Sequence, residues 1–275
     1  MSTLISAPEL ASELAGERAP VVLDVRYALG RPGWGRAQFE AGHIAGARFV
    51  DVDEDLAEHP REDRVGGRHP LPERDVFVET LRRLGVSHNS SVVVLDQSTS
   101  LSAARAWWML RDAGVPDVRV LNGGMAAWEA AGLPLTTEAT PEPEPGLIDV
   151  GLPLLPVVDA DGVEALLEVG YQVFDVRAEE RFRGEVEPID PVAGHIPGAQ
   201  NLPATLLQAD GYFLSAEAMR ELTKHVRPGD AVSCGSGITA CQALLALEVA
   251  GVEGVQLYAG SWSDWISDPS RPIAR

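Results

Sequence analysis

The sequence predicts an α/β protein made of two tandem domains of the same kind, each a mostly parallel sheet with helices on both faces. Two observations predict this fold. Short apolar, β-branched runs alternate with amphipathic helical patterns throughout the 275-residue chain, and such alternation is typical of a parallel sheet covered by helices. Motifs of the first half also recur in the second half. We therefore expect an N-terminal domain in residues 1–135, a linker in 136–150 and a C-terminal domain in 151–275.

Two motifs carry the internal repeat. "VVLDVR" at residues 21–26 returns as "QVFDVR" at 172–177, and "AGHIAGA" at 41–47 returns as "AGHIPGA" at 193–199. Each second copy lies about 150 residues after the first copy, and chance seldom preserves both order and spacing. The two histidines occur in both halves, so we expect them to belong to a shared structural turn.

The first half shows its elements in order. Apolar runs at 21–25, 91–95 and 118–121 predict strands. "PERDVFVETLRRLG", with Pro72 near its start, and "AARAWWMLRDAG", which closes on Gly114, predict helices between them. "TTEATPEPEPG" is rich in Pro and Glu and has no apolar periodicity, which indicates an extended, solvated linker.

The second half contains both cysteines of the chain in one segment, "AVSCGSGITACQALLALEVAG". We expect a strand to end at Ser233, Cys234 to follow it, and a helix to begin near Thr239. Ligands bind outside the carboxyl ends of parallel strands, so this loop lies where a functional site is expected. The first half has Asp96 at the matching position. Only the second half therefore keeps a nucleophile.

The residues around Cys234 suit a reactive sulfur. Gly235 and Gly237 allow a tight turn whose backbone N–H groups point inward, and the following helix adds its positive end. Both effects favour negative charge on the Cys234 sulfur, and a thiolate is a nucleophile at neutral pH. Cys241 lies about two helical turns further on, so we expect it to be a buried packing residue.

Composition excludes several classes of function. The formal net charge is −19, spread along the chain, which argues against nucleic-acid or anionic-membrane partners. No apolar run approaches a membrane span, and the N-terminal segment lacks the pattern of a signal peptide. We therefore expect a cytoplasmic protein without a structural disulfide. The histidines and cysteines show no metal-ligand spacing, so neither a metal nor another cofactor is expected.

The motifs together resemble the tandem-domain rhodaneses, which are thiosulfate and 3-mercaptopyruvate sulfurtransferases. The resemblance extends from about residue 4 to about residue 268 and rests on the repeated "DVR" and "GHI(A/P)GA", on "CGSGITAC" in the second half only, and on "GSWSDW" near the C-terminus. It implies two rhodanese-like domains and a Cys234 persulfide that passes sulfur to a thiol or cyanide acceptor, with thioredoxin as one candidate thiol. The residues expected to bind the small anionic donor through the loop are Gly235, Gly237, Ile238 and Thr239.

The loop favours one of two donors. "CGSG" resembles the 3-mercaptopyruvate enzymes, whereas thiosulfate enzymes usually carry basic residues just after the cysteine, where cations favour a compact dianion. Ser236 is expected to donate a hydrogen bond to the donor carbonyl. The resemblance implies that it works with His69, in "HPLP", and Asp53, in "FVDVDED". We expect 3-mercaptopyruvate as the donor, with thiosulfate as the alternative.

The expected donor anchor departs from the family pattern. Arg181, in "RFRGEVEP", matches the family arginine that binds the acidic group of the donor. A second arginine usually follows the "EP", but here Pro188 is followed by Ile189 and Asp190. Arg183 is a candidate substitute, and the departure keeps thiosulfate open as the donor.

Two further hypotheses come from other classes of protein. Cysteine phosphatases carry an arginine six residues after the nucleophile, and this chain has Ala240 there, so the main cationic partner of a phosphate is missing. A noncatalytic binding module fits the half with Asp96 but not the half with the complete loop. A persulfide formed on incubation with a donor separates an enzyme from such a module.

Overall fold

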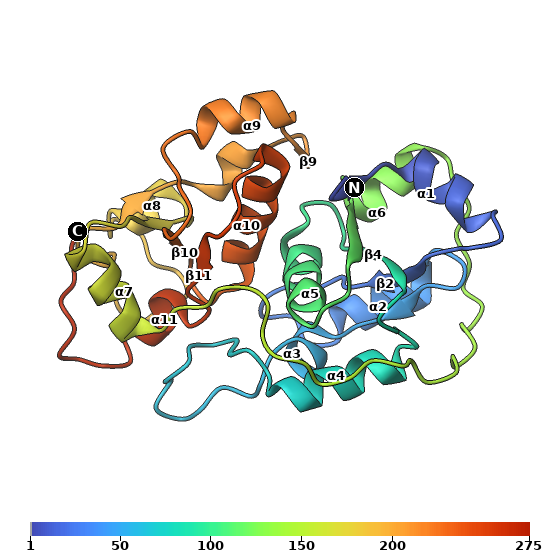
Figure 1. The fold of residues 1–275 in the computed structure, drawn as a ribbon, viewed down its shortest axis with the longest axis horizontal. Coiled ribbons are helices and arrows are strands. Elements are labelled where there is room, and N and C mark those ends of the chain that lie inside the picture. The colour runs from blue at the N-terminus through green and yellow to red at the C-terminus, as the bar shows by residue number, and fades with distance from the viewer. Residues whose placement is uncertain (1) are drawn as a thin grey trace. The chain divides into compact units, whose positions relative to one another are not determined.

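The computed structural model describes residues 2–275, which form two compact units (Figure 1). Unit 1 contains residues up to 56 together with 72–154, and unit 2 contains 57–71 and 155–275. This division differs from the domains expected from the sequence. The segment 57–71 has neither helix nor strand and belongs to unit 2.

The predicted linker also differs in part from its expectation. Its residues form no helix and no strand, but Thr136 makes an isolated antiparallel bridge with His43. They are not all solvated, because Ile148 is buried and its carbonyl accepts a hydrogen bond of 2.9 Å from the Arg82 side chain. The end of the linker therefore packs within unit 1.

The sheet of unit 1 is parallel, in the order β1-β5-β4-β2-β3. Its strands are β1 (Leu4–Ile5), β2 (Val21–Asp24), β3 (Arg48–Phe49), β4 (Ser91–Leu95) and β5 (Asp117–Leu121). Its helices are α1 (Ala7–Leu14), α2 (Trp34–Ala41), α3 (Val52–Asp55), α4 (Arg74–Arg83), α5 (Leu101–Asp112) and α6 (Gly124–Ala130).

The core of unit 1 is built on the alternation of strand side chains. Val93 and Leu95 pack in one cluster with residues of α1, α2 and α6. Val92 and Val94 point to the opposite face because successive side chains alternate, and α5 packs on β4 and β5. Helices thus cover both faces (Figure 1). Both faces are buried, which explains why β4 reads as a continuous apolar run.

Unit 2 repeats this arrangement with a parallel sheet in the order β11-β10-β6-β7. Its strands are β6 (Val173–Asp175), β7 (Gln200–Asn201), β10 (Ala231–Ser233) and β11 (Gln256–Leu257), and β8 (Gln208–Ala209) pairs with β9 (Tyr212–Phe213) as a separate hairpin. Its helices are α7 (Ala160–Glu168), α8 (Glu179–Phe182), the 3₁₀-helix η1 (Ala204–Leu207), α9 (Ala216–Leu222), α10 (Ile238–Ala250) and α11 (Ser261–Trp265).

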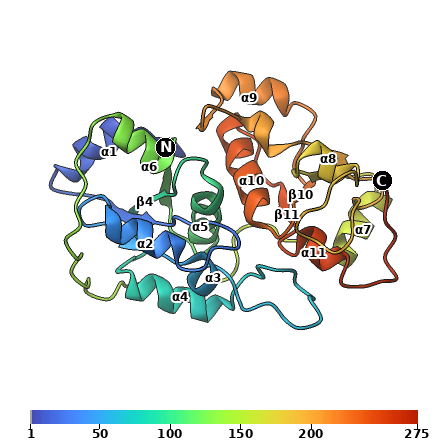
Figure 2. The ribbon, with the colours of Figure 1, turned by 180° about the vertical axis from the view of Figure 1, so that it is seen from behind.

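The two sheets have the same topology, which confirms the repeat. β11, β10, β6 and β7 correspond in order to β5, β4, β2 and β3. An isolated parallel bridge between Val157 and Leu257 corresponds to the pairing of β1 with β5. Figure 2 shows α10 beside α9 and α11 beside α7, and these contacts lie within unit 2. The predicted fold class is therefore confirmed.

The repeated motifs form one structural unit in each half. In unit 1, the Arg26 guanidinium binds Asp24 and donates to the carbonyl of Gly42, which precedes the motif histidine, at 2.8 Å. In unit 2, Arg177 binds Asp175 and donates to the carbonyl of Gly194 at 2.7 Å. The arginine of "DVR" thus ties the strand to the "GHI" turn, which is why the two motifs recur together.

The histidines of these turns have structural contacts. His43 Nδ1 lies 2.8 Å from the carbonyl of Phe39 and its ring stacks on that phenylalanine. His195 makes the same two contacts with Phe182, at 2.8 Å to the carbonyl. These matched contacts agree with the structural role expected from the sequence.

Candidate active site

The site begins where β10 ends and the chain turns into α10. Cys234 follows directly after Ser233, is 2% exposed, and is a free thiol. The backbone N–H of Gly237 donates to Cys234 Sγ at 3.1 Å, and Ser261 Oγ lies 3.9 Å from the same sulfur. The Ser261 hydroxyl donates to the carbonyl of Tyr258 at 2.8 Å, so the Gly237 N–H and the N-terminal end of α10 are the groups that favour negative charge at this position.

Cys241 lies inside α10 and is fully buried. Its Sγ donates to the carbonyl of Gly237 at 3.3 Å, and it is a free thiol. It is therefore a buried packing residue in the first part of α10, as the sequence predicts, and it forms no disulfide with Cys234.

Gly237 is required for the shape of this loop. Its φ is +84°, and a Cβ at this position would lie 2.3 Å from the carbonyl oxygen of Ala259. Both the left-handed conformation and the close backbone approach exclude a side chain. The N–H that contacts the sulfur therefore depends on glycine.

We expect Gly237→Ala to lower kcat of the reaction at Cys234 by about 10- to 100-fold, the range for a lost hydrogen bond to a charged group. Gly251→Ala is the matched control, because Gly251 also has a positive φ of +82° but no atom would lie within 4 Å of its Cβ. Steady-state rates and unfolding curves of both variants measure the effect. Equal rates for the two variants would contradict a role of the Gly237 N–H in catalysis.

Ser236 and His69, which the resemblance assigns to the same site, contact each other. His69 Nδ1 lies 2.8 Å from Ser236 Oγ, although the residues are 167 positions apart in the chain. Both side chains are buried, each at 7% exposure. A hydroxyl that contacts an imidazole can exchange a proton with it. This contact lies close to Cys234, because Ser236 is two residues further along the loop.

Helix α11, part of "GSWSDW", holds both the loop and the segment that carries His69. Ser263 N–H donates to the carbonyl of Gly235 at 3.0 Å, and Ser263 Oγ accepts the N–H of Arg68 at 3.1 Å. Asp264 accepts a further N–H of the same segment at 2.7 Å. The sequence marks this motif as a family feature but does not indicate a role for the Ser263 and Asp264 side chains.

Arg181 extends from the end of α8 toward the loop and is held by two carboxylates. It binds Glu187 through Nε at 3.2 Å and Nη2 at 2.7 Å, and Asp190 through Nη2 at 3.2 Å. A Cβ on Gly235 would lie 3.6 Å from Arg181 Nη2. The predicted donor anchor is therefore beside the backbone that follows the nucleophile.

The two carboxylates differ in their response to burial. Burial raises the pKa of Asp190, and the neighbouring Glu187 adds to this, whereas Arg68 and Arg181 act against it. Burial also acts to raise the pKa of Glu187, but hydrogen bonds from Arg181 and from the backbone of Asp190 and Ile189 outweigh it and lower that pKa.

The other predicted site residues are distributed as follows. Ile238 and Thr239 form the first turn of α10, next to the loop. Arg183 is 48% exposed and pairs with Glu179 and Glu185, so it does not replace a donor-binding arginine at the loop. Asp53 belongs to α3 of unit 1, where its N–H donates to Asp51 at 3.0 Å. Its part in catalysis stays a prediction.

In unit 1, Asp96 occupies the position that matches Cys234. Its buried carboxylate accepts the N–H groups of Ser98, Ser100 and Ser102 at 3.1, 2.9 and 3.2 Å. Burial raises the pKa of Asp96, and the backbone donors act against that rise. The backbone donors of this loop are thus bound to a side chain of the protein itself, and the loop has no cysteine.

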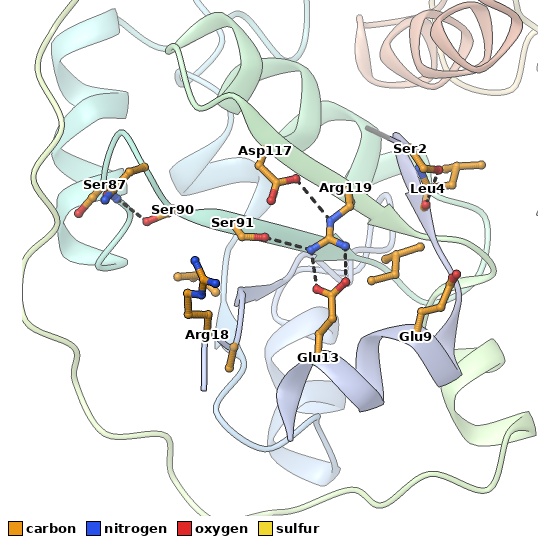
Figure 3. Close-up of a pocket in the computed structure, with 14 residues that line it drawn as sticks. Ser2, Leu4, Glu9, Glu13, Arg18, Ser87, Ser90, Ser91, Asp117 and Arg119 are labelled. Atoms are coloured by element: carbon orange, nitrogen blue, oxygen red, sulfur yellow. Dashed lines mark hydrogen bonds and ion pairs between the residues drawn. The ribbon is translucent and has the colours of Figure 1, made fainter. Parts of the chain in front are cut away.

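A cavity of about 820 Å³ lies at the opposite, amino edge of the unit 1 sheet (Figure 3). Arg119 lies within it and is paired with Glu13 through two hydrogen bonds of 2.6 Å and with Ser91 at 3.0 Å. Its cation is thus neutralised locally. The cavity contains none of the predicted site residues.

No group of three or more possible metal ligands occurs among residues 2–275. Within the same part of the chain, no helix is long and apolar enough to cross a membrane.

Comparisons with known proteins give matches over nearly the whole chain. The family model described as "Rhodanese-like domain" matches residues 6–131 and 159–268. A probable 3-mercaptopyruvate sulfurtransferase of Pseudomonas aeruginosa is 44% identical over 98% of this chain and 97% of that protein. A putative thiosulfate sulfurtransferase of Mycobacterium tuberculosis is 40% identical over 99% of this chain and 96% of that protein.

A solved structure shows the same similarity in three dimensions. The crystal structure of SseA from Escherichia coli, described as a 3-mercaptopyruvate sulfotransferase, superposes with a TM-score of 0.82 at 34% identity. The match covers 96% of this chain and all of that one.

Proposed function

Since the chain belongs to the rhodanese family and is a sulfurtransferase, we propose that it takes sulfur from 3-mercaptopyruvate, carries it as a persulfide on Cys234, and passes it to a thiol or cyanide. The observation that carries the choice of donor is the 2.8 Å contact between Ser236 and His69. A hydroxyl with an imidazole partner suits a donor whose carbonyl becomes an enolate.

The first half-reaction is a displacement at sulfur. The Cys234 thiolate attacks the thiol sulfur of 3-mercaptopyruvate, an S–S bond forms, and the C–S bond breaks with its electron pair passing to carbon. The resulting enolate takes up the former thiol proton and leaves as pyruvate. The Ser236 hydroxyl donates a hydrogen bond to the enolate oxygen, and His69 transfers the former thiol proton to the enolate carbon. The Gly237 N–H, 3.1 Å from Sγ, favours the charged persulfide.

The second half-reaction restores the thiolate. A thiol or cyanide attacks the outer sulfur, the S–S bond breaks, and its electron pair returns to Cys234 Sγ. A protein thiol such as thioredoxin is a candidate acceptor. We propose the cytoplasm as the setting, because a reducing compartment keeps both cysteines as thiols.

Parallel assays with 3-mercaptopyruvate and with thiosulfate, both with cyanide as acceptor, test the proposal. We expect pyruvate release to match thiocyanate formation and kcat/KM to be higher for 3-mercaptopyruvate. A higher kcat/KM for thiosulfate would overturn the proposed donor.

Ser236→Ala is expected to slow turnover of 3-mercaptopyruvate much more than turnover of thiosulfate. Loss of one hydrogen bond to a developing oxyanion lowers kcat by about 10²- to 10³-fold. We therefore expect kcat for 3-mercaptopyruvate to fall by that range. Thiosulfate has no carbonyl, so its turnover should change little. Ser270→Ala is the control, because Ser270 is exposed and bonds Asp268 in a turn near the C-terminus. An equal loss with both donors would contradict the proposed role of Ser236.

Thiosulfate is the second candidate donor. The relative from M. tuberculosis, 40% identical, carries thiosulfate in its name, and two guanidinium groups lie beside Gly235. Cations near the nucleophile favour a dianion. The carboxylates of Glu187 and Asp190, which pair with Arg181, weaken this argument.

A further inference from the structure

Arg68 lies at the same point of the active loop as the expected anchor Arg181. A Cβ built on Gly235 would lie 3.0 Å from Arg68 Nη2 and 3.6 Å from Arg181 Nη2. Two guanidinium groups therefore flank the residue that follows the nucleophile. One comes from segment 57–71 and the other from α8, and both belong to unit 2.

The Arg68 side chain is fixed in place but is not saturated with hydrogen bonds. Its Nη1 pairs with Asp190, and its backbone N–H is held by Ser263. Its Nε is buried and has no hydrogen-bond partner among residues 2–275. A buried guanidinium N–H without a partner is costly. An anion bound beside Gly235 would satisfy such a donor.

Asp190 connects the two arginines. Its Oδ1 pairs with Arg68 and its Oδ2 lies 3.2 Å from Arg181, while its side chain is only 2% exposed. The N–H of Asp190 donates to Glu187 at 3.0 Å, and Glu187 also holds Arg181. A carboxylate that binds two guanidinium groups fixes their relative orientation.

We propose that Arg68 is the second donor-binding arginine of this enzyme and that Asp190 is the positioning residue that aligns it with Arg181. Arg68 supplies, from another segment, the cation that is missing at Ile189 after Pro188. This inference rests on the proposed function insofar as the ligand is a small anionic sulfur donor. It adds the residues that recognise the acidic group of that donor.

The charges of the cluster also affect the choice of donor. The formal charges of Arg68 and Arg181 are matched by those of Glu187 and Asp190. A third arginine, Arg177, lies 3.4 Å from Glu187 and is matched by Asp175. A bound monoanionic carboxylate leaves the cluster with one excess negative charge, whereas thiosulfate leaves two. Like charges in a partly buried site repel one another, so Asp190 disfavours the dianion relative to the monoanion.

The test compares Arg68→Ala with the control Arg183→Ala, which removes an exposed arginine from the same unit. We expect Arg68→Ala to lower kcat/KM for 3-mercaptopyruvate by about 10- to 100-fold, chiefly through KM, as for a lost charge-assisted hydrogen bond. Arg68→Lys should recover part of the loss, because it keeps the charge without the planar fork. Ile189→Arg in the Arg68→Ala background should also recover activity.

A second readout separates donor binding from a structural role. Enzyme already loaded with sulfur and freed of donor should pass it to cyanide at the wild-type rate in Arg68→Ala, because the donor has left. Asp190→Asn should raise the ratio of kcat/KM for thiosulfate to that for 3-mercaptopyruvate. A folded Arg68→Ala or Arg68→Lys with wild-type KM for both donors, or slowed equally in both half-reactions, would overturn the inference, as would an unchanged donor ratio in Asp190→Asn.

The identity of the sulfur donor is tested separately from the role of Arg68. If wild type releases no pyruvate from 3-mercaptopyruvate but uses thiosulfate, the proposed function fails. The KM of the Arg68 variants for thiosulfate then decides the role of Arg68 independently.

Discussion

Cys234→Ser is expected to reduce sulfur transfer from both 3-mercaptopyruvate and thiosulfate by about 10³-fold or more. A serine hydroxyl at this position cannot carry sulfane sulfur, and the remaining groups only bind the donor. Mass spectrometry after incubation with donor should show one added sulfur atom on wild type and none on the variant. Steady-state thiocyanate formation gives the rates.

Cys241→Ser is the control for this prediction. Cys241 is buried in α10 and its sulfur bonds the carbonyl of Gly237, an interaction that a hydroxyl can also make. Its rate should stay within a few fold of wild type. Transfer that survives in Cys234→Ser and disappears in Cys241→Ser would assign the sulfur carrier to the other cysteine.

Arg177→Met is expected to destabilise unit 2 by about 3–5 kcal/mol, the cost of leaving a buried charge without its partner. The Arg177 side chain is 1% exposed and binds Asp175 at 2.6 Å, and its guanidinium lies 4.8 Å from the ring centre of Trp262. Its loss leaves the buried Asp175 carboxylate without its cationic partner and removes the hydrogen bond to the "GHI" turn. Denaturant unfolding would measure the loss of stability, and native-state hydrogen exchange would show in which unit it occurs.

Two variants serve as comparisons for Arg177→Met. Arg183→Met removes a half-exposed arginine with surface partners only, so the unfolding free energy should change by less than about 0.5 kcal/mol. Arg26→Met removes the equivalent buried arginine of unit 1, so its loss of protection should appear in that unit. Similar unfolding curves for Arg177→Met and Arg183→Met would refute the structural role of the motif.

Features encoded by local sequence were predictable. β4 was expected at residues 91–95 and has those bounds, and β10 ends at Ser233 as expected. Strand periodicity and glycines with positive φ, such as Gly237, depend on a few neighbouring residues. The repeat added the topology, because two halves with the same motif order have the same strand order.

Features decided by distant partners were not predictable from the sequence. Strands β3 and β7 have two residues each and carry no periodic pattern. The pairing of Arg68 with Asp190 joins residues 122 positions apart. Nothing local distinguishes Arg68 from Arg183, since both are arginines in polar segments. Only the tertiary contacts of Ser263 and Asp190 place one of them at the loop and leave the other on the surface.

The membership of segment 57–71 in unit 2 affects how such a duplicated chain can change over time. The stretch of sequence that supplies His69 and Arg68 is encoded within the first repeat, yet its contacts are with the second. The two sequence repeats are thus interdependent, because the site proposed in unit 2 uses residues encoded in the first repeat. Removal of the first repeat would therefore also remove His69 and Arg68 from the proposed site.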